Sequence, residues 1–134
     1  PGIIDSHVHF NLRISPDLIT SDDFTSGSAA AACGGVTTVI DYTGQPQGIN
    51  LLKGIRQRQK EAEGRMHTDY SLHCVIPAWK KLKDPAKQMK EAIAAGVPSF
   101  KLFMIYEDRG MMADDSDIYE ALTAAKKLGG LIYH

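Results

Sequence analysis

The sequence predicts an α/β fold in which parallel strands alternate with helices, as in the first half of a (β/α)₈ TIM barrel. Five short apolar runs rich in Val, Ile and aromatic residues recur along the chain, with helical segments between them. Such alternation implies right-handed crossovers and a parallel sheet. A whole barrel needs roughly 250 residues. A chain of 134 residues therefore supplies about half of one.

The expected strands are near-continuous apolar runs, which is the pattern of strands buried on both faces of a parallel sheet. They cover residues 3–10, 36–42, 70–76, 99–105 and 131–134. The chain opens on the first run and stops within the last. Because the backbone groups of a buried strand need ladder partners, we expect residues 1–134 to be a partial barrel domain that is truncated at both ends.

The expected helices carry start and stop signals. Capping or acidic residues precede each helical segment, and glycine follows three of the four. Proline at the first helical position strengthens the third start. The four helices are expected to begin at residues 21–23, Asn50, Asp84–Pro85 and Asp115 or Ser116, and to end at Ala32, Gly64, Gly96 and Gly129–Gly130. The last helix is expected to bury Ile118, Leu122, Ala125 and Leu128 on one face.

Several other classes are disfavoured. A doubly wound open sheet is the competing topology, but no GxGxxG or GxxxxGK[ST] motif follows any strand. The 15 basic and 16 acidic residues give a net charge of -1, so no overall field favours nucleic acid or an anionic membrane. No apolar run reaches the length of about 18 residues that a membrane span needs. The first residues lack a secretion-signal layout. Cys33 and Cys74 lie in apolar stretches and predict two buried thiols in a reducing cytoplasm.

The first strand ends in His7-Val8-His9. Residues i and i+2 of a strand point to the same side. Both imidazoles can therefore converge on one ion at the carboxyl end of the sheet, where the active sites of barrel enzymes lie. Two ordinary histidines at a strand end are the alternative.

The fourth apolar run contains one lysine, Lys101. Burial should lower the pKa of this amine and leave it neutral and nucleophilic. The neutral amine can form a Schiff base, or it can add carbon dioxide and become a carbamate whose two oxygens bridge two metal ions. A lysine that reaches water is the alternative. His134 ends the fifth run, so metal-binding residue types come from three strands that should meet near a barrel axis.

Four segments closely resemble the dihydropyrimidinase/hydantoinase group of the amidohydrolase superfamily, and the resemblance runs along essentially the whole chain. These segments are residues 1–10, 20–24, 34–38 and 99–106. The resemblance implies a metal-dependent (β/α)₈ barrel with a small β-sandwich beside it. It also implies a homo-oligomer, which is a tetramer in this family.

The resemblance also implies roles for single residues. His7 and His9 match the ligands of one metal ion, and His134 matches a ligand of the second. Lys101 matches the carboxylated lysine that bridges both ions. Tyr106 matches the tyrosine that donates to the substrate carbonyl and its developing oxyanion. Nitrogen and oxygen ligands suit two divalent ions such as zinc.

The implied enzyme opens a small cyclic amide, a dihydropyrimidine or hydantoin ring, to an N-carbamoyl amino acid. A hydroxide that bridges the two ions would be the nucleophile. The family also needs a histidine and an aspartate from later strands, so residues 1–134 alone are expected to be inactive. Asn11 stands where dihydroorotase-like enzymes carry arginine, whereas an allantoinase-like activity stays open. A non-catalytic interaction protein on the same fold is a further alternative, which the retained ligands argue against.

Other roles are expected for four further side chains and one loop. Asp5 is a candidate to orient a ligand histidine, although a polar residue in a strand is about as good an interpretation. Asp41 ends the second strand and either lines the site or caps the following loop. His67 and His73 are expected to be structural. The segment 11–20, which includes Leu12, Arg13 and Ile14, follows the histidines and is expected to shape the pocket.

Overall fold

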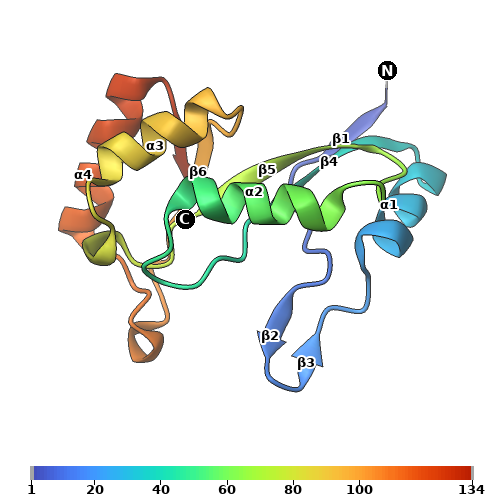
Figure 1. Cartoon of the computed structure of the whole chain (residues 1–134), viewed down its shortest axis with the longest axis horizontal. Helices are drawn as coiled ribbons and strands as arrows, with labels where there is room; N and C mark the ends of the chain where they lie inside the picture. Colours follow the sequence, from blue (N-terminus) through green and yellow to red (C-terminus); the bar gives the residue numbers. More distant parts are fainter. Residues whose placement is uncertain (1, 134) are drawn as a thin grey trace. The chain divides into compact units, whose positions relative to one another are not determined.

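A computed structural model describes residues 2–133 (Figure 1). Within this range the chain forms two compact units, which are described separately. The first unit comprises residues 2–42 and 58–72, and the second comprises residues 43–57 and 73–133. The boundary between them falls within one helix and within one strand.

Parallel strands form the centre of the first unit. β1 (Ile3–Asp5) pairs in parallel with β4 (Val36–Tyr42), and the next strand in order is β5 (Asp69–Val75), whose first four residues belong to this unit. Asp5 lies opposite Val39 in the register of β1 and β4. The strand order β1-β4-β5 follows the chain without reversal, as expected for a barrel rather than a doubly wound sheet.

Helix α1 (Phe24–Cys33) packs on β4 and closes the core of the first unit. It begins with a reciprocal cap, because Asp23 Oδ1 accepts the Ser26 N–H at 2.8 Å and Ser26 Oγ accepts the Asp23 N–H at 3.1 Å. The core comprises Phe10, Phe24, Val39 and Ala62.

The predicted first strand, residues 3–10, is too long. β1 ends at Asp5, and Ile3 and Ile4 are 63% and 62% exposed rather than buried on both faces. The following loop contains an unpredicted antiparallel hairpin of β2 (Arg13–Ser15) and β3 (Leu18–Ile19). Asn11, at φ 46°, turns the chain into this hairpin, and asparagine tolerates the left-handed region better than most residues.

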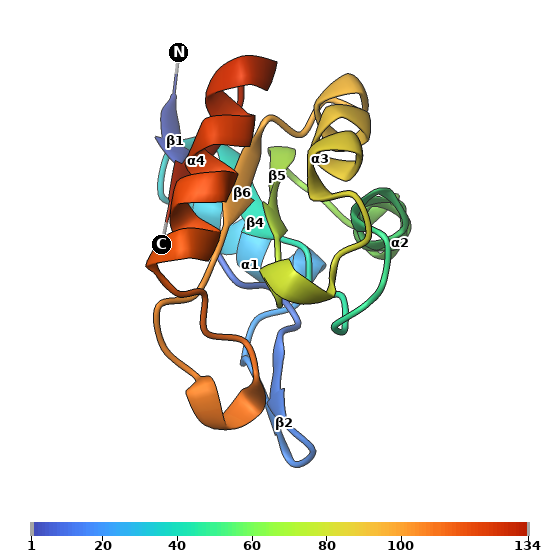
Figure 2. The ribbon, with the colours of Figure 1, turned by 90° about the vertical axis from the view of Figure 1, so that its left-hand side faces the viewer.

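The second unit contains the end of β5, β6 (Ser99–Lys101) and β7 (Leu131–Tyr133), all parallel and in chain order. Helices α3 (Pro85–Ala94) and α4 (Asp115–Leu128) pack against each other, and α4 also contacts β7 (Figure 2). The first seven residues of α2 (Leu51–Ala62) belong to this unit. Two short 3₁₀ turns lie at Trp79–Lys81 and Glu107–Arg109.

The predicted fold class is confirmed, since parallel strands alternate with helices, but some details of the second unit differ from the predictions. The fourth strand ends at Lys101 rather than at residue 105. Helix α4 begins at Asp115, one of the two predicted starts, and Asp114 caps it. Ala125 is buried as predicted, but Leu122 is 48% exposed, because the buried face of α4 also includes Asp117 and Ala121.

Only one of the two cysteines is buried. Cys74 lies in the interior of the second unit, whereas Cys33, at the end of α1, is exposed. The prediction of a buried thiol was therefore wrong for Cys33.

None of the helices within residues 2–133 has both the length and the apolar character that a membrane crossing requires.

Candidate metal centre

His7 and His9 lie close together directly after β1. Their ring centroids are 5.2 Å apart, and the ring planes meet at 81°. Val8, between them, donates its N–H to the carbonyl of Ile40 at 3.2 Å, so the segment continues alongside β4 beyond the end of β1. Alternation along an extended chain places the two imidazoles on one side. The structure thus brings together the two histidines that the sequence predicted as a pair.

An aromatic side chain that was not predicted from the sequence lies against both histidines. The buried ring of Tyr42, at the end of β4, lies 4.7 Å from the ring of His7 and 4.5 Å from that of His9, measured between centroids. β4 pairs with β1, so the ends of the two strands are neighbours. The only sequence signal for Tyr42 is its place at the end of the expected second strand.

The Asp5 carboxylate contacts the main chain of the histidine segment. Its Oδ1 accepts the backbone N–H of His7 at 3.1 Å. The contact orients the His7 backbone rather than its imidazole ring.

Lys101 is the last residue of β6 and lies in register between Val75 of β5 and Tyr133 of β7. The side chain is half-buried, and its Nζ lies 5.5 Å from the centroid of the Phe103 ring. Burial lowers the pKa of the Lys101 ammonium. This is the direction that the sequence predicted.

Tyr106 follows β6 in the second unit and adopts a left-handed backbone, with φ 68°. A bulky residue in this region is uncommon, so the surrounding loop must hold it. The Tyr106 carbonyl accepts the N–H groups of Arg109 and Met111, each at 3.1 Å. The Arg109 guanidinium carbon also lies 4.8 Å from the centroid of the Tyr106 ring. The side chain remains 37% exposed.

His73 contacts neighbouring side chains through its ring, whereas His67 makes a main-chain contact. His73 Nδ1 lies 2.6 Å from the buried Ser99 Oγ, and the His73 ring lies 4.8 Å from the ring of Tyr133. The backbone N–H of His67 donates to Ser28 Oγ at 3.0 Å.

The predicted site residues are thus divided between the two units. His7 and His9 belong to the first unit, Lys101 and Tyr106 belong to the second, and His134 lies outside the described residues. Within residues 2–133, no three His, Cys, Asp or Glu side chains gather as a metal-binding group. In the first unit, the two adjacent imidazoles of His7 and His9 are nitrogen donors of a kind that suits zinc.

Comparison with known proteins places this arrangement in a family. Residues 1–134 match the amidohydrolase family. The chain is 39% identical over 133 residues to D-hydantoinase of Geobacillus stearothermophilus, and the match covers 98% of this chain and 27% of that protein. It is 36% identical over 132 residues to dihydropyrimidinase of Dictyostelium discoideum, covering 98% of this chain and 25% of that protein.

Solved structures give the same result. A crystal structure of D-hydantoinase matches with a TM-score of 0.88 at 36% identity, over 98% of this chain and 28% of that one. A D-hydantoinase (dihydropyrimidinase) from Thermus sp. matches with a TM-score of 0.86 at 32% identity, over 98% of this chain and 28% of that one. The predicted half-barrel is confirmed in that the fold matches part of the hydantoinase (β/α)₈ barrel. The chain spans about a quarter of the length of these relatives, and it belongs to the amidohydrolase family.

Proposed function

We propose that this chain is part of a metal-dependent hydrolase that opens a dihydropyrimidine or hydantoin ring to an N-carbamoyl amino acid. Relatives named D-hydantoinase and dihydropyrimidinase support this substrate class. The activity proposed is that of the intact protein, meaning a chain of the relatives' length that carries residues 1–134.

The observation that carries the proposal is the pair of imidazoles after β1. His7 and His9 lie 5.2 Å apart between ring centroids, and the buried Tyr42 ring lies against both. These two residues would hold one divalent ion. Neutral imidazole is the commonest side-chain metal ligand in proteins.

Lys101 supplies the second part of the proposal. Its neutral amine attacks carbon dioxide, a C–N bond forms and one proton leaves, so that the side chain ends as an anionic carbamate. The carbamate of Lys101 would be a ligand shared by two divalent ions, and His134 would be a ligand of the second ion. Bound zinc ions would supply an activated water and polarise the scissile carbonyl.

Tyr106 has a separate task in the reaction. Its phenol O–H is proposed to donate to the substrate carbonyl oxygen as negative charge develops there. The left-handed backbone and the Arg109 contact hold the ring, and the side chain is exposed enough to meet a substrate. The segment 11–20, including Leu12, Arg13 and Ile14, is proposed to border the pocket that selects the ring.

Turnover by the intact protein tests the proposal. Dihydrouracil, hydantoin and allantoin are offered in parallel, before and after treatment with a chelator. We expect hydrolysis of dihydrouracil or hydantoin, loss of this activity on chelation and recovery when zinc is returned. Preference for allantoin would indicate the allantoinase-like alternative instead. Hydrolysis that survives complete metal removal would contradict the metal-dependent mechanism.

A further inference from the structure

Asp41 and Arg58 form a buried ion pair in the first unit that the proposed mechanism does not use. Asp41 lies in β4 and Arg58 in α2, and their side chains are 2% and 8% exposed. Arg58 donates through Nε at 2.9 Å and through Nη2 at 2.6 Å to the same oxygen, Asp41 Oδ2. Arg58 Nη1 donates to Glu61 Oε2 at 2.8 Å, and the guanidinium carbon lies 4.5 Å from the centroid of the Phe24 ring.

The stability of the fold does not by itself explain why a charged pair is buried here. Desolvation of two charges is often as large as their attraction, so an apolar pair of similar volume commonly gives a fold that is as stable. The geometry here offers an explanation, because both charged groups also bind the same short piece of main chain.

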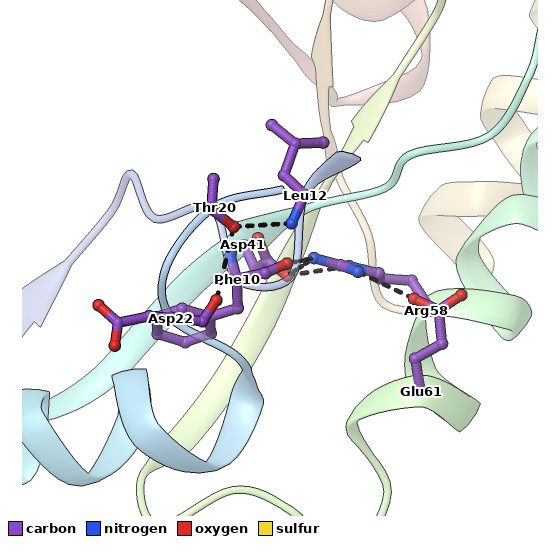
Figure 3. Close-up of polar contacts among 7 residues, drawn as sticks. All are labelled: Phe10, Leu12, Thr20, Asp22, Asp41, Arg58 and Glu61. Atoms are coloured by element: carbon purple, nitrogen blue, oxygen red, sulfur yellow. Dashed lines mark hydrogen bonds and ion pairs between the residues drawn. The ribbon is translucent and has the colours of Figure 1, made fainter. Parts of the chain in front are cut away.

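That piece of main chain is Phe10 (Figure 3). Its N–H donates to Asp41 Oδ1 at 3.4 Å, and its carbonyl accepts a hydrogen bond from Arg58 Nη2. The Phe10 ring is buried and lies 6.1 Å from the Phe24 ring between centroids. Contacts therefore fix both the main chain and the side chain of Phe10.

Phe10 directly follows His9, which gives these contacts a consequence for the histidines. On the other side of His9, Val8 is fixed by its hydrogen bond to Ile40. After Phe10, the left-handed Asn11 donates its N–H to the carbonyl of Asp22 at 2.7 Å and turns the chain away. The direction of the His9 side chain is thus set by fixed peptide groups before and after it.

We infer that Asp41 and Arg58 are positioning residues, which fix the Phe10 backbone and thereby hold His9 and His7 in the orientation that binds a metal ion. The inference rests on the proposed role of the two histidines as ligands. The pair acts through Phe10. Removing residues that orient metal ligands typically weakens metal binding about 10- to 100-fold.

The test is the zinc affinity of the intact protein, measured by competition with a chromophoric chelator, together with amide hydrogen exchange at Phe10. Arg58→Met removes the hydrogen bonds and retains an apolar stem. Arg56→Met changes an exposed arginine on the same helix and is the matched control. Met89→Ala, in the buried core of α3, controls for general destabilisation. We expect Arg58→Met to bind zinc about 10- to 100-fold more weakly and to exchange the Phe10 amide faster, whereas both controls retain the wild-type affinity.

A second variant keeps the test valid if the lone Asp41 charge prevents folding. Asp41→Asn combined with Arg58→Met leaves no unpaired buried charge but still lacks the guanidinium on the Phe10 carbonyl. We expect this double variant to fold and still to bind zinc more weakly than wild type. If a folded Arg58 variant bound zinc with wild-type affinity, the positioning role would be overturned and the proposed function would stand. Failure of the wild-type protein to bind zinc would instead overturn the proposed function.

Discussion

At the scale of single residues, the imidazoles of His7 and His9 lie together against the buried ring of Tyr42. The HxH spacing already places two side chains on one side of an extended chain. Tyr42 joins them only because β4 pairs with β1, a contact between residues far apart in sequence. Arg58 was missed for the same reason, since an arginine in an amphipathic helix gives no sign that it is buried. Asp41, which the sequence left open between two roles, is paired with Arg58 instead.

The burial of the two cysteines was also only partly predictable from the sequence. Cys33 and Cys74 both lie in apolar stretches, but Cys33 ends a helix and faces outward. Burial raises the pKa of the Cys74 thiol to about 12, so this cysteine is inert as a nucleophile.

Tyr106 is expected to matter for the chemical step of the proposed reaction. Tyr106→Phe removes only the hydroxyl, so we expect kcat of the intact protein to fall about 100- to 1000-fold, as when one oxyanion donor is removed. Metal content should be unchanged, because the phenol is not proposed as a ligand. Tyr119→Phe, at a 73% exposed position of α4, is the matched control. Equal kcat in the two variants would remove the assigned role of Tyr106.

At the scale of elements, helices were predicted better than strands. Caps are local, so α2, α3 and α4 begin within one residue of their predicted starts, and α1 begins directly after its acidic segment. The strands β1 and β6 are shorter than predicted, because each apolar run continues past the end of its strand into a loop. In the loop after β6, Met104 and Ile105 are 51% and 59% exposed. Hydrophobic runs alone do not distinguish a buried strand from an apolar loop.

Gly27 of α1 is required by close packing. A Cβ at this position would lie 2.2 Å from an edge carbon of the Phe10 ring, well inside contact distance. Alanine normally improves a helix interior by about 1 kcal/mol over glycine. Here we expect Gly27→Ala to lower the free energy of unfolding by about 1–3 kcal/mol, because the buried ring must shift.

Denaturant unfolding of the intact protein measures this effect, with Thr25→Ala at an exposed position of the same helix as the control. A Gly27→Ala protein more stable than wild type would show that the Phe10 ring is not closely packed.

The start of α4 should be sensitive to acid. A hydrogen bond from Lys80 and one from the Asp117 N–H lower the pKa of the Asp114 carboxyl below its ordinary 3.8. The unfolded state then binds more protons than the folded state. This stabilisation is complete above the unfolded pKa and is lost as pH falls through the lower folded value.

Asp114→Asn retains a capping oxygen but does not titrate. We expect its thermal midpoint to fall less than that of wild type between about pH 5 and about pH 2.5. Asp115→Asn, one residue further along and exposed, is the control. If the thermal midpoints of the wild-type and Asp114→Asn proteins fell equally with pH, the assigned role of the Asp114 carboxylate would be contradicted.

At the scale of the whole molecule, exposed apolar residues on the outer strands predict association. Ile3 and Ile4 of β1 and Leu131 of β7 are each at least 62% exposed. Within residues 2–133, β1 and β7 each pair with a strand on one side only. Unpaired apolar strand edges promote self-association. We expect residues 1–134, expressed alone, to sediment as oligomers and to show no ring-opening activity. A monodisperse monomer with a cooperative thermal transition would contradict this expectation.

In the proposed function, His7, His9 and Lys101 are ligands of two divalent ions. Elemental analysis of the purified intact protein tests this assignment most directly, with wild type compared with Lys101→Ala and with the exposed control Lys53→Ala. Two ions per subunit are expected in wild type and in Lys53→Ala, and far fewer in Lys101→Ala, since the bridging carbamate cannot form. The same two ions in Lys101→Ala, or none in wild type, would contradict the account.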